Sequence, residues 1–243
     1  MNGAGKTTTF SMITNEIIET HGNWFLMDGS INFSENPRLF TSKIGYCPQV
    51  QSNLECMTGR ETLNFFAKIR GIPEKFIRED VQNLAKMVGL EEFLDEIISG
   101  YSGGTKRKLS LAVALIGNPK LLILDEPTAG VDPVARRKIW KTLDFVKKIF
   151  NCSIILSSHS MDECEALCSR IGILSHGGFR CIGSSQELRT KYGQGFTIVI
   201  VFKQAKRFDK NYSDLVTKDF MAIFPRAQAK DFHEGMLNFH IPD

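Results

Sequence analysis

Two groups of residues between positions 101 and 133 have types and spacing that suit nucleotide chemistry. The first is a Ser-Gly-Gly turn at Ser102 that leads into a helical pattern, and backbone amides at a helix start favour phosphate oxygens. The second is the pair Asp125 and Glu126, which follows a short apolar run. Paired carboxylates at the end of a strand suit Mg²⁺ and an attacking water. We therefore expect Asp125 to hold the metal and Glu126 to polarise the water.

The chain begins with part of another phosphate-binding pattern. Gly5, Lys6 and Thr7 match the end of GxxxxGK[ST], whose first glycine would fall one position before Met1. The amides of residues 3–7 can wrap a β-phosphate, and Lys6 can reach the β and γ oxygens. The Thr7 hydroxyl suits Mg²⁺. Taken alone, the segment is also compatible with a glycine-rich helix start, and the downstream motifs favour the nucleotide interpretation.

Three further polar residues follow predicted strands or precede a helix. His159 comes after the apolar run 153–156, which we expect to be a buried strand that aims it at the sheet edge of Asp125. There it could touch a γ-phosphate and orient the water. Gln49 follows a short predicted strand and could reach Mg²⁺ or the water. Taken singly, His159 would be structural, Gln49 a surface residue, and Asp132 a turn former before a proline.

Strands alternate with helices along most of the chain, which predicts a mostly parallel α/β sheet. The continuous apolar run 121–124 is typical of a strand buried on both faces. Residues from about 52 to 100 form an all-helical insertion between α/β segments. The expected helices are near 5–22, 59–70, 77–88, 102–116, 136–150, 161–168 and 184–192, and the expected strands are 43–47, 121–124, 153–156, 171–174 and 179–182.

A second, smaller unit is expected after the glycine pair at Gly193 and Gly195. Its predicted elements are a strand at 197–202, a helix at 215–223, and strands at 227–232 and 236–241. The order β-α-β-β is part of a ferredoxin-like unit.

The composition is ordinary for a globular protein of 243 residues, which allows one large domain or a domain with an appendage. The net charge of +3 is too mild to argue for nucleic acid. The sequence contains neither an apolar run long enough for a membrane span nor a signal pattern. Six cysteines without a CxxC pair favour free thiols in a reducing compartment over a zinc site.

Taken together, the motifs resemble the nucleotide-binding domain of an ABC transporter over residues 2–192. The segments GYCPQ, MTGRETL, YSGGTKRKLS and LSSHSMDECEALCSRIGIL further resemble subfamily A, the lipid-exporting transporters, and most closely its C-terminal nucleotide-binding domain. The matching residues are Asn2, Gly3, Ala4, Gly5, Lys6, Thr7 and Thr8 (Walker A), Gln49 (Q-loop), Ser102, Gly103 and Gly104 (signature), Asp125 and Glu126 (Walker B and base), Asp132 (D-loop) and His159 (H-loop).

The resemblance implies a P-loop NTPase of the ABC ATPase type, a three-layer α/β sandwich with a mostly parallel sheet. Residues 1–193 would form the nucleotide-binding domain, with a helical subdomain at about 52–104. Residues 194–243 would be a partial, ferredoxin-like C-terminal regulatory domain. The strand that precedes the P-loop in this family is not in the sequence, so we expect exposed strand edges in the middle of the sheet.

The resemblance also implies a mechanism with ATP and Mg²⁺ as cofactors. Glu126, His159 and Gln49 would be catalytic, and Thr7, Gln49 and Asp125 would hold the metal. The Walker A residues and Asp132 would contact nucleotide. A second nucleotide-binding domain would close head to tail, so that Ser102, Gly103 and Gly104 bind the γ-phosphate of the partner's ATP.

In the intact transporter, this closure would power lipid export through membrane domains, which contact the nucleotide-binding domains through coupling helices. The chain would lie at the cytoplasmic face of a membrane as part of an integral membrane protein. Two alternatives remain open. The chain could be an inactive or incomplete fragment that binds nucleotide weakly without turnover, or a soluble ABC ATPase of translation or DNA repair. The KRKLS segment and the tail argue against the latter.

Overall fold

Strand β4 (Leu121–Asp125) is the central strand of a three-stranded parallel sheet, and all of its residues are buried. Strand β3 (Ile44–Cys47) pairs with one edge of β4, and β5 (Ser153–Ser157) pairs with the other. The computed structural model describes residues 3–27, 29–50, 54–193, 195–202, 210–233 and 236–241. Within them, the predicted parallel α/β sheet is confirmed, and its central strand lies where the sequence predicts it.

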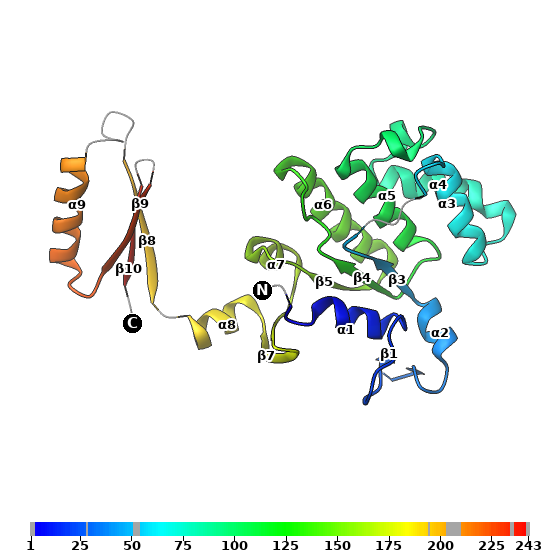
Figure 1. Ribbon diagram of the computed structural model, residues 1–243, viewed down its shortest axis with the longest axis horizontal. Helices are drawn as coiled ribbons and strands as arrows, with labels where there is room; N and C mark the ends of the chain where they lie inside the picture. Colours follow the sequence, from blue (N-terminus) through cyan, green and yellow to red (C-terminus); the bar gives the residue numbers. More distant parts are fainter. Residues whose placement is uncertain are drawn as a thin grey trace. The chain divides into compact units, whose positions relative to one another are not determined.

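Both faces of this sheet are covered, because successive side chains of β4 point in opposite directions. Leu122 belongs to the hydrophobic cluster formed with α5 (Gly103–Leu115) and α6 (Pro133–Phe150). Ile123 belongs to the cluster formed with α1 (Lys6–Ile13). Figure 1 shows α1 on one side of the sheet and α5 and α6 on the other. The core therefore has three layers.

A helical segment lies between β3 and α5. It contains α3 (Gly59–Ile69), α4 (Glu74–Val88) and two short 3₁₀ helices, η1 (Glu91–Phe93) and η2 (Ile98–Gly100). Thr58 starts α3 with a capping box, in which its side chain and that of the third helical residue satisfy each other's backbone amides. The described part of the segment has the helices that the sequence predicts, whereas residues 51–53 lie outside the described residues.

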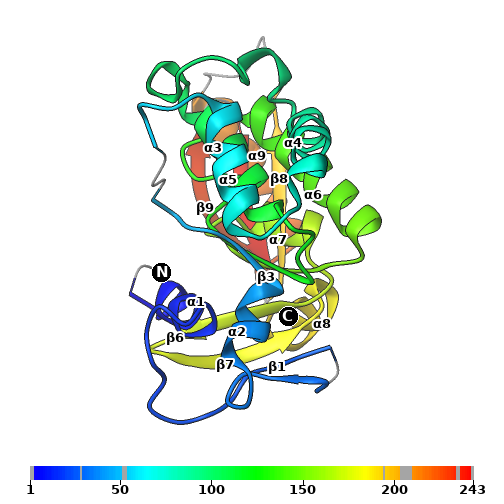
Figure 2. The same cartoon turned by 90° about the vertical axis from the view of Figure 1, so that its right-hand side faces the viewer.

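The sheet packs closely on α5. A Cβ built on Gly45 in β3 would lie 2.0 Å from the carbonyl oxygen of Ala114 in α5. Any side chain at this position would push the helix away from the sheet. The remaining elements of this unit are β1 (Phe25–Leu26), β2 (Ile31–Asn32), α2 (Pro37–Ser42) and α7 (Met161–Leu167). Figure 2 shows α1, α2 and β1 gathered on one side of β3.

The first helix is shorter than the sequence predicts. It ends at Ile13 instead of continuing towards residue 22. Asn15 adopts a φ of 64°, a left-handed conformation that ends the helix, and the amides of the next two residues both donate to the Ser11 carbonyl. Ile17 and Ile18, expected on the apolar face, are consequently 48% and 86% exposed.

Strand β5 is only partly buried, which corrects the prediction of a buried strand. Ile155 is 41% exposed. In the described part of the chain, β5 pairs only with β4, and β6 (Ile171–Ser175) pairs only with β7 (Gly178–Gly183). Residues of β5 and β6 line the same cavity of about 460 Å³. Ser153 and Ile155 are the exposed residues of β5, whereas Ser157 at its end is buried.

The chain divides into two compact units, residues 1–182 and 183–243. The boundary predicted from the sequence lies further along, at residue 193. The second unit contains α8 (Ser185–Tyr192), β8 (Phe196–Val201), α9 (Lys210–Ile223), β9 (Gln228–His233) and β10 (Met236–Ile241).

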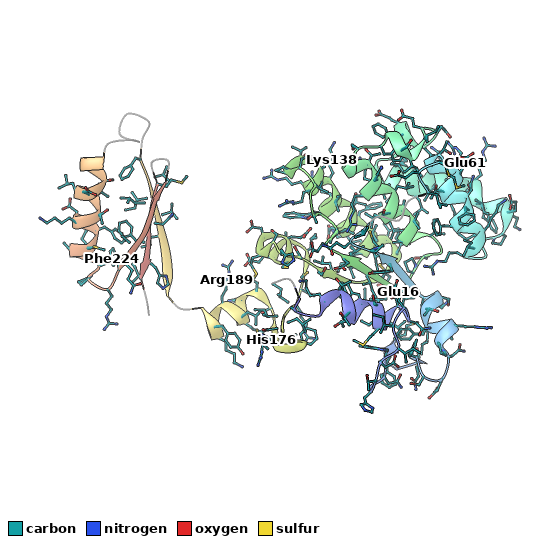
Figure 3. All side chains as sticks on the ribbon, in the orientation of Figure 1. Glu16, Glu61, Lys138, His176, Arg189 and Phe224 are labelled. Carbon is teal, nitrogen blue, oxygen red and sulfur yellow. The ribbon has the colours of Figure 1, made fainter. Side chains whose placement is uncertain are left out.

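The three strands of the second unit form an antiparallel sheet in the order β8-β10-β9. Phe220 of α9 stacks on Phe239 of β10 with ring centroids 4.1 Å apart, so the helix covers one face of the sheet. Phe224, labelled in Figure 3, continues this contact beyond the end of α9, with its ring centroid 4.9 Å from that of Phe220. The observed β-α-β-β order is the one predicted.

Among the helices that the structure describes in both units, none combines the length and the apolar character that a membrane span requires.

Candidate functional site

Asp125 stands at the carboxyl end of β4 and is 1% exposed. Its Oδ2 accepts a hydrogen bond of 2.8 Å from the Thr7 hydroxyl at the start of α1. Its Oδ1 accepts one of 2.5 Å from the hydroxyl of Ser157 at the end of β5. The structure therefore brings together two of the three residues that the sequence predicts as metal ligands, Thr7 and Asp125, while the third, Gln49, contacts Glu126.

Glu126 lies among the other predicted catalytic residues. Its Oε2 accepts a hydrogen bond of 3.0 Å from the Gln49 side-chain amide. Its Oε1 lies 2.9 Å from His159 Nε2. The Glu126 side chain is 14% exposed and that of His159 is 41% exposed, so the pair borders solvent. All three predicted catalytic side chains meet at the edge of the sheet where β3, β4 and β5 end.

The backbone of Glu126 is held in an uncommon conformation. Its φ is 49°, in the left-handed region, which costs a residue other than glycine about 1–3 kcal/mol. Its amide donates to the Ser157 hydroxyl at 3.0 Å. The surrounding contacts keep this conformation, and it directs the carboxylate towards Gln49 and His159.

The P-loop forms a turn of positive-φ glycines before α1. Gly3 has a φ of 75° and Gly5, the N-cap residue, a φ of 99°. Within the described residues, no side chain caps the first amides of α1, and its first turn contains no acidic residue. Lys6, Thr7 and Thr8 supply that turn, whereas the predicted contact residue Asn2 lies outside the described residues. Amides arranged in this way form an anion-binding site.

The donor set fits Mg²⁺ and a phosphate group. A hydroxyl, a carboxylate and an amide are hard ligands, and Mg²⁺ is usually held by one or two carboxylates together with substrate phosphates. The described residues contain no cluster of three or more His, Cys, Asp or Glu side chains that could hold a metal. Thr7, Asp125 and Gln49 would therefore hold the ion only in combination with phosphate oxygens.

The signature residues stand at the start of α5. Ser102 caps this helix, since its hydroxyl accepts a hydrogen bond of 3.1 Å from the amide of Thr105. Ser102 and Gly103 are exposed. In the part of the chain that the structure describes, no hydrogen bond joins them to Thr7 or Asp125. The structure thus leaves the signature segment outside the cluster around Asp125.

Asp132 caps α6. Its Oδ1 accepts hydrogen bonds from the amides of Ala135 at 2.9 Å and Val134 at 3.0 Å, which lower the pKa of the carboxyl below its ordinary value. The cap starts the helix at Pro133 rather than at the predicted Arg136. The nucleotide contact predicted for Asp132 remains a prediction.

Arg107 is a site residue that sequence reasoning missed. It is 4% exposed, and its guanidinium donates to main-chain carbonyl oxygens on both sides of the Gln49–Glu126 contact. The sequence held a signal for it. Arg107 stands four residues before Leu111 and seven before Ala114, so it lies on the apolar face of its helix.

Glu163 was also missed. It is 1% exposed, and its Oε1 accepts from the Thr128 hydroxyl and from Trp140 Nε1, both at 2.9 Å. Its Oε2 accepts from the hydroxyl of Ser158 at 2.6 Å. Glu163 thereby links the residue before His159 to the segment after Glu126. The sequence offers no signal that separates it from its acidic neighbours.

Two side chains at the end of β3 have raised pKa values. Burial, followed by the charges of Glu16 and Asp125, raises the pKa of Tyr46 to about 12. Burial also raises the pKa of the Cys47 thiol. Both groups stay neutral at physiological pH and contribute packing beneath the polar cluster.

Comparisons with known proteins agree with this geometry. The family model described as ABC transporter matches residues 1–129, more than half of the chain. The glucosylceramide transporter ABCA12 of Homo sapiens is 43% identical over 245 aligned positions, which cover 100% of this chain and 9% of that protein. The phospholipid-transporting ATPase ABCA3 of Mus musculus is 42% identical, with 99% of this chain and 14% of that protein covered.

Solved structures support the same fold. An ATP-binding subunit of an ABC transporter superimposes with a TM-score of 0.69 at 27% identity, covering 79% of each chain. CbiO1 from Clostridium perfringens, described as part of the ABC transporter complex cbiONQ, gives 0.70 at 25% identity over 90% of this chain and 84% of that one. The fold is that of a P-loop NTPase, the curated relatives named above are members of subfamily A, and the chain belongs to the ABC transporter family.

Proposed function

We propose that this chain binds ATP with Mg²⁺ and hydrolyses its γ-phosphate to drive a transporter. The observation that carries the proposal is the position of the Glu126 carboxylate. It contacts Gln49 and His159 and directly follows Asp125, which holds the Thr7 hydroxyl. A general base, two orienting groups and a metal-binding pair are therefore contiguous, which is the arrangement that phosphoryl transfer to water requires.

Each residue has a distinct role in this proposal. The amides at the start of α1 and the Lys6 ammonium would bind the phosphates, while Thr7, Asp125 and Gln49 would hold Mg²⁺ together with those phosphates. Bound Mg²⁺ neutralises charge on the phosphate oxygens. Glu126 accepts a proton from the attacking water, and His159 and Gln49 keep that water in line. The side-chain contacts of Glu126 support this assignment, because they fix both carboxylate oxygens.

We further propose that Ser102, Gly103 and Gly104 serve the nucleotide of a second nucleotide-binding domain. Ser102 and Gly103 are exposed and Gly104 is half-buried at the start of α5, which leaves this turn accessible to a partner. Asp132, at the start of α6, would contact nucleotide in the same closed dimer. Asn2 would join the phosphate contacts of its own domain.

The transported cargo is proposed from the relatives. Two of them are named as a glucosylceramide transporter and a phospholipid-transporting ATPase, and this chain spans 9% and 14% of their lengths. We infer lipid export or flipping, driven through coupling helices of membrane domains, with the chain at the cytoplasmic face. Residues 194–243 would then act as part of a C-terminal regulatory domain.

A second candidate is nucleotide binding without turnover. The cavity between β5 and β6 favours it, because Lys6 and Ser157 line this cavity directly beside the site. A phosphate group bound beside this cavity has room to shift, and a shifted γ-phosphate would lose the in-line alignment with the attacking water that hydrolysis needs.

Replacing Glu126 with Gln tests the proposal. Loss of the general base should reduce ATP turnover by roughly 100-fold or more while nucleotide binding persists. Turnover is measured by phosphate release and binding by titration with a fluorescent ATP analogue. Glu79→Gln, on the exposed face of α4, is the matched control. Turnover that survives Glu126→Gln would contradict the base assignment. If the wild-type protein binds ATP but releases no phosphate, the result favours the second candidate.

A further inference from the structure

Arg107 connects two segments of the site through its guanidinium, which donates to five main-chain carbonyl oxygens. Nη1 donates to Pro48 at 2.7 Å and to Gln49 at 3.3 Å. Nη2 donates to Asp125 at 2.6 Å and to Glu126 at 2.8 Å, and Nε donates to Pro127 at 3.0 Å. In the described part of the chain, no carboxylate forms an ion pair with it. Its charge is matched by backbone dipoles alone.

These carbonyls belong to the last residue of β4 and to the segments that follow β3 and β4. The side chains of Gln49 and Glu126, one from each segment, touch at 3.0 Å. The same guanidinium binds the backbone carbonyl of each of these residues. The buried Arg107 guanidinium therefore fixes the distance between the backbones of Gln49 and Glu126, whose side chains contact each other.

Arg107 also stabilises the uncommon backbone of Glu126. The left-handed φ of 49° is held at the amide by the Ser157 hydroxyl and at the carbonyl by Arg107. If the carbonyl contact is lost, Glu126 can relax towards the common right-handed region, and its carboxylate then turns away from His159.

We propose that Arg107 is a positioning residue for the catalytic pair Gln49 and Glu126. This inference rests on the proposed function. Arg107 contacts the main-chain carbonyls of both segments, and in this proposal it acts by keeping the two backbones in register. Arg107 belongs to α5, the helix capped by Ser102. The orientation of Glu126 therefore also depends on the position of this helix.

The chemistry requires an arginine. A guanidinium is a planar fork with five N–H donors, and here its three nitrogens reach two separate segments. A lysine keeps the positive charge but presents its donors from one point, so it can bind the carbonyls of only one segment. Arg107→Lys therefore removes the link while it retains the charge.

The test compares Arg107→Lys with Arg70→Lys in the purified full-length protein. Arg70 also donates to main-chain carbonyls, Ile44 at 2.8 Å and Ser42 at 3.4 Å, but at the opposite end of β3. We expect Arg107→Lys to lower kcat by about tenfold or more, with the ATP dissociation constant unchanged. We expect Arg70→Lys to leave kcat unchanged. To give kcat, the maximal rate of each variant is divided by the concentration of folded protein. The folded fraction comes from a denaturant unfolding curve of the same variant.

A double-mutant cycle separates positioning from a general structural role. If Arg107 acts in part by keeping Gln49 in contact with Glu126, then Arg107→Lys should lower kcat less in a Gln49→Ala background than in the wild type, and the remaining loss reflects its contact with the Glu126 carbonyl. Effects that simply multiply would overturn the proposal, and so would an unchanged kcat in Arg107→Lys. Arg107→Gln is the second variant. If neither Arg107 variant folds whereas Arg70→Lys does, Arg107 is a structural residue and the proposal fails.

Glu126→Gln keeps the two hypotheses apart. If Glu126→Gln abolishes turnover but Arg107→Lys does not change it, only the positioning role is wrong. If Glu126→Gln leaves turnover intact, the proposed function itself is wrong.

Discussion

His159 Nε2 lies 2.9 Å from Glu126 Oε1, although the two residues come from different strand ends. We predict that His159→Ala will lower ATP turnover by roughly 100-fold, because the carboxylate loses the group that fixes one of its oxygens. Nucleotide affinity should stay unchanged, since the imidazole has no role in the phosphate-binding turn at α1. Steady-state kinetics with a separate binding titration would check both parts. His21→Ala, at an exposed position, is the control.

Thr7→Val should separate metal binding from phosphate binding. The change keeps the shape of the side chain but removes the hydroxyl that donates to Asp125 at 2.8 Å. We expect Mg²⁺ affinity in the nucleotide complex to fall roughly 10- to 100-fold, while binding of metal-free ATP persists. Titration of Mg²⁺ into protein with a fluorescent ATP analogue measures this. Thr142→Val, which removes only a hydroxyl bonded within its own helix, should change nothing.

Glu163→Ala should destabilise the fold. The change leaves the hydrogen-bond donors of Thr128, Trp140 and Ser158 without their acceptor. We predict a loss of about 2–3 kcal/mol in the free energy of unfolding, measured by urea denaturation. Glu163→Gln, which keeps one acceptor oxygen, should lose less. An equal loss in Asp162→Ala, at the exposed neighbouring position, would show that the cluster is not the cause.

Tyr46 should make stability fall at high pH. Its pKa is about 12 in the folded protein against an ordinary value of 10.0, so the folded state disfavours the phenolate. The resulting stabilisation is present below pH 10 and is lost as the pH rises from about 10 towards 12. A tyrosinate absorbance titration of wild type and Tyr46→Phe isolates this group. A difference curve centred near pH 10 would contradict the prediction.

The sequence predicts the site well where a motif and a strand end coincide. Asp125 and Glu126 follow the buried run Leu121–Leu124, and the parallel order of β3, β4 and β5 then brings Gln49 and His159 to the same edge. Neither step requires knowledge of side-chain contacts. The start of α5 was likewise marked by its cap at Ser102, whereas the cap at Asp132 was not read as the start of α6.

What the sequence did not reveal depends on long-range contacts. The position of Arg107 on the apolar face of its helix predicts burial, and Glu163 resembles its acidic neighbours, but only the fold shows which main-chain or hydroxyl groups the two side chains reach. The end of α1 was missed because Ile17 and Ile18 continue a helical spacing beyond the left-handed Asn15. The exposure of Ile155 was missed because an apolar run cannot reveal whether both faces of a strand are covered.

The turn that we propose to bind phosphate contacts the hairpin between β6 and β7. The carbonyl of Ala4 accepts a hydrogen bond of 3.0 Å from the amide of Gly177, and a Cβ on Gly5 would lie 3.4 Å from the Gly177 Cα. His176 and Gly177 form the turn of this hairpin, both with positive φ. Hairpin turns usually tolerate insertions. Here an added residue would break the hydrogen bond between Gly177 and Ala4 that supports the P-loop. The length of this turn is therefore constrained more strictly than its exposed position implies.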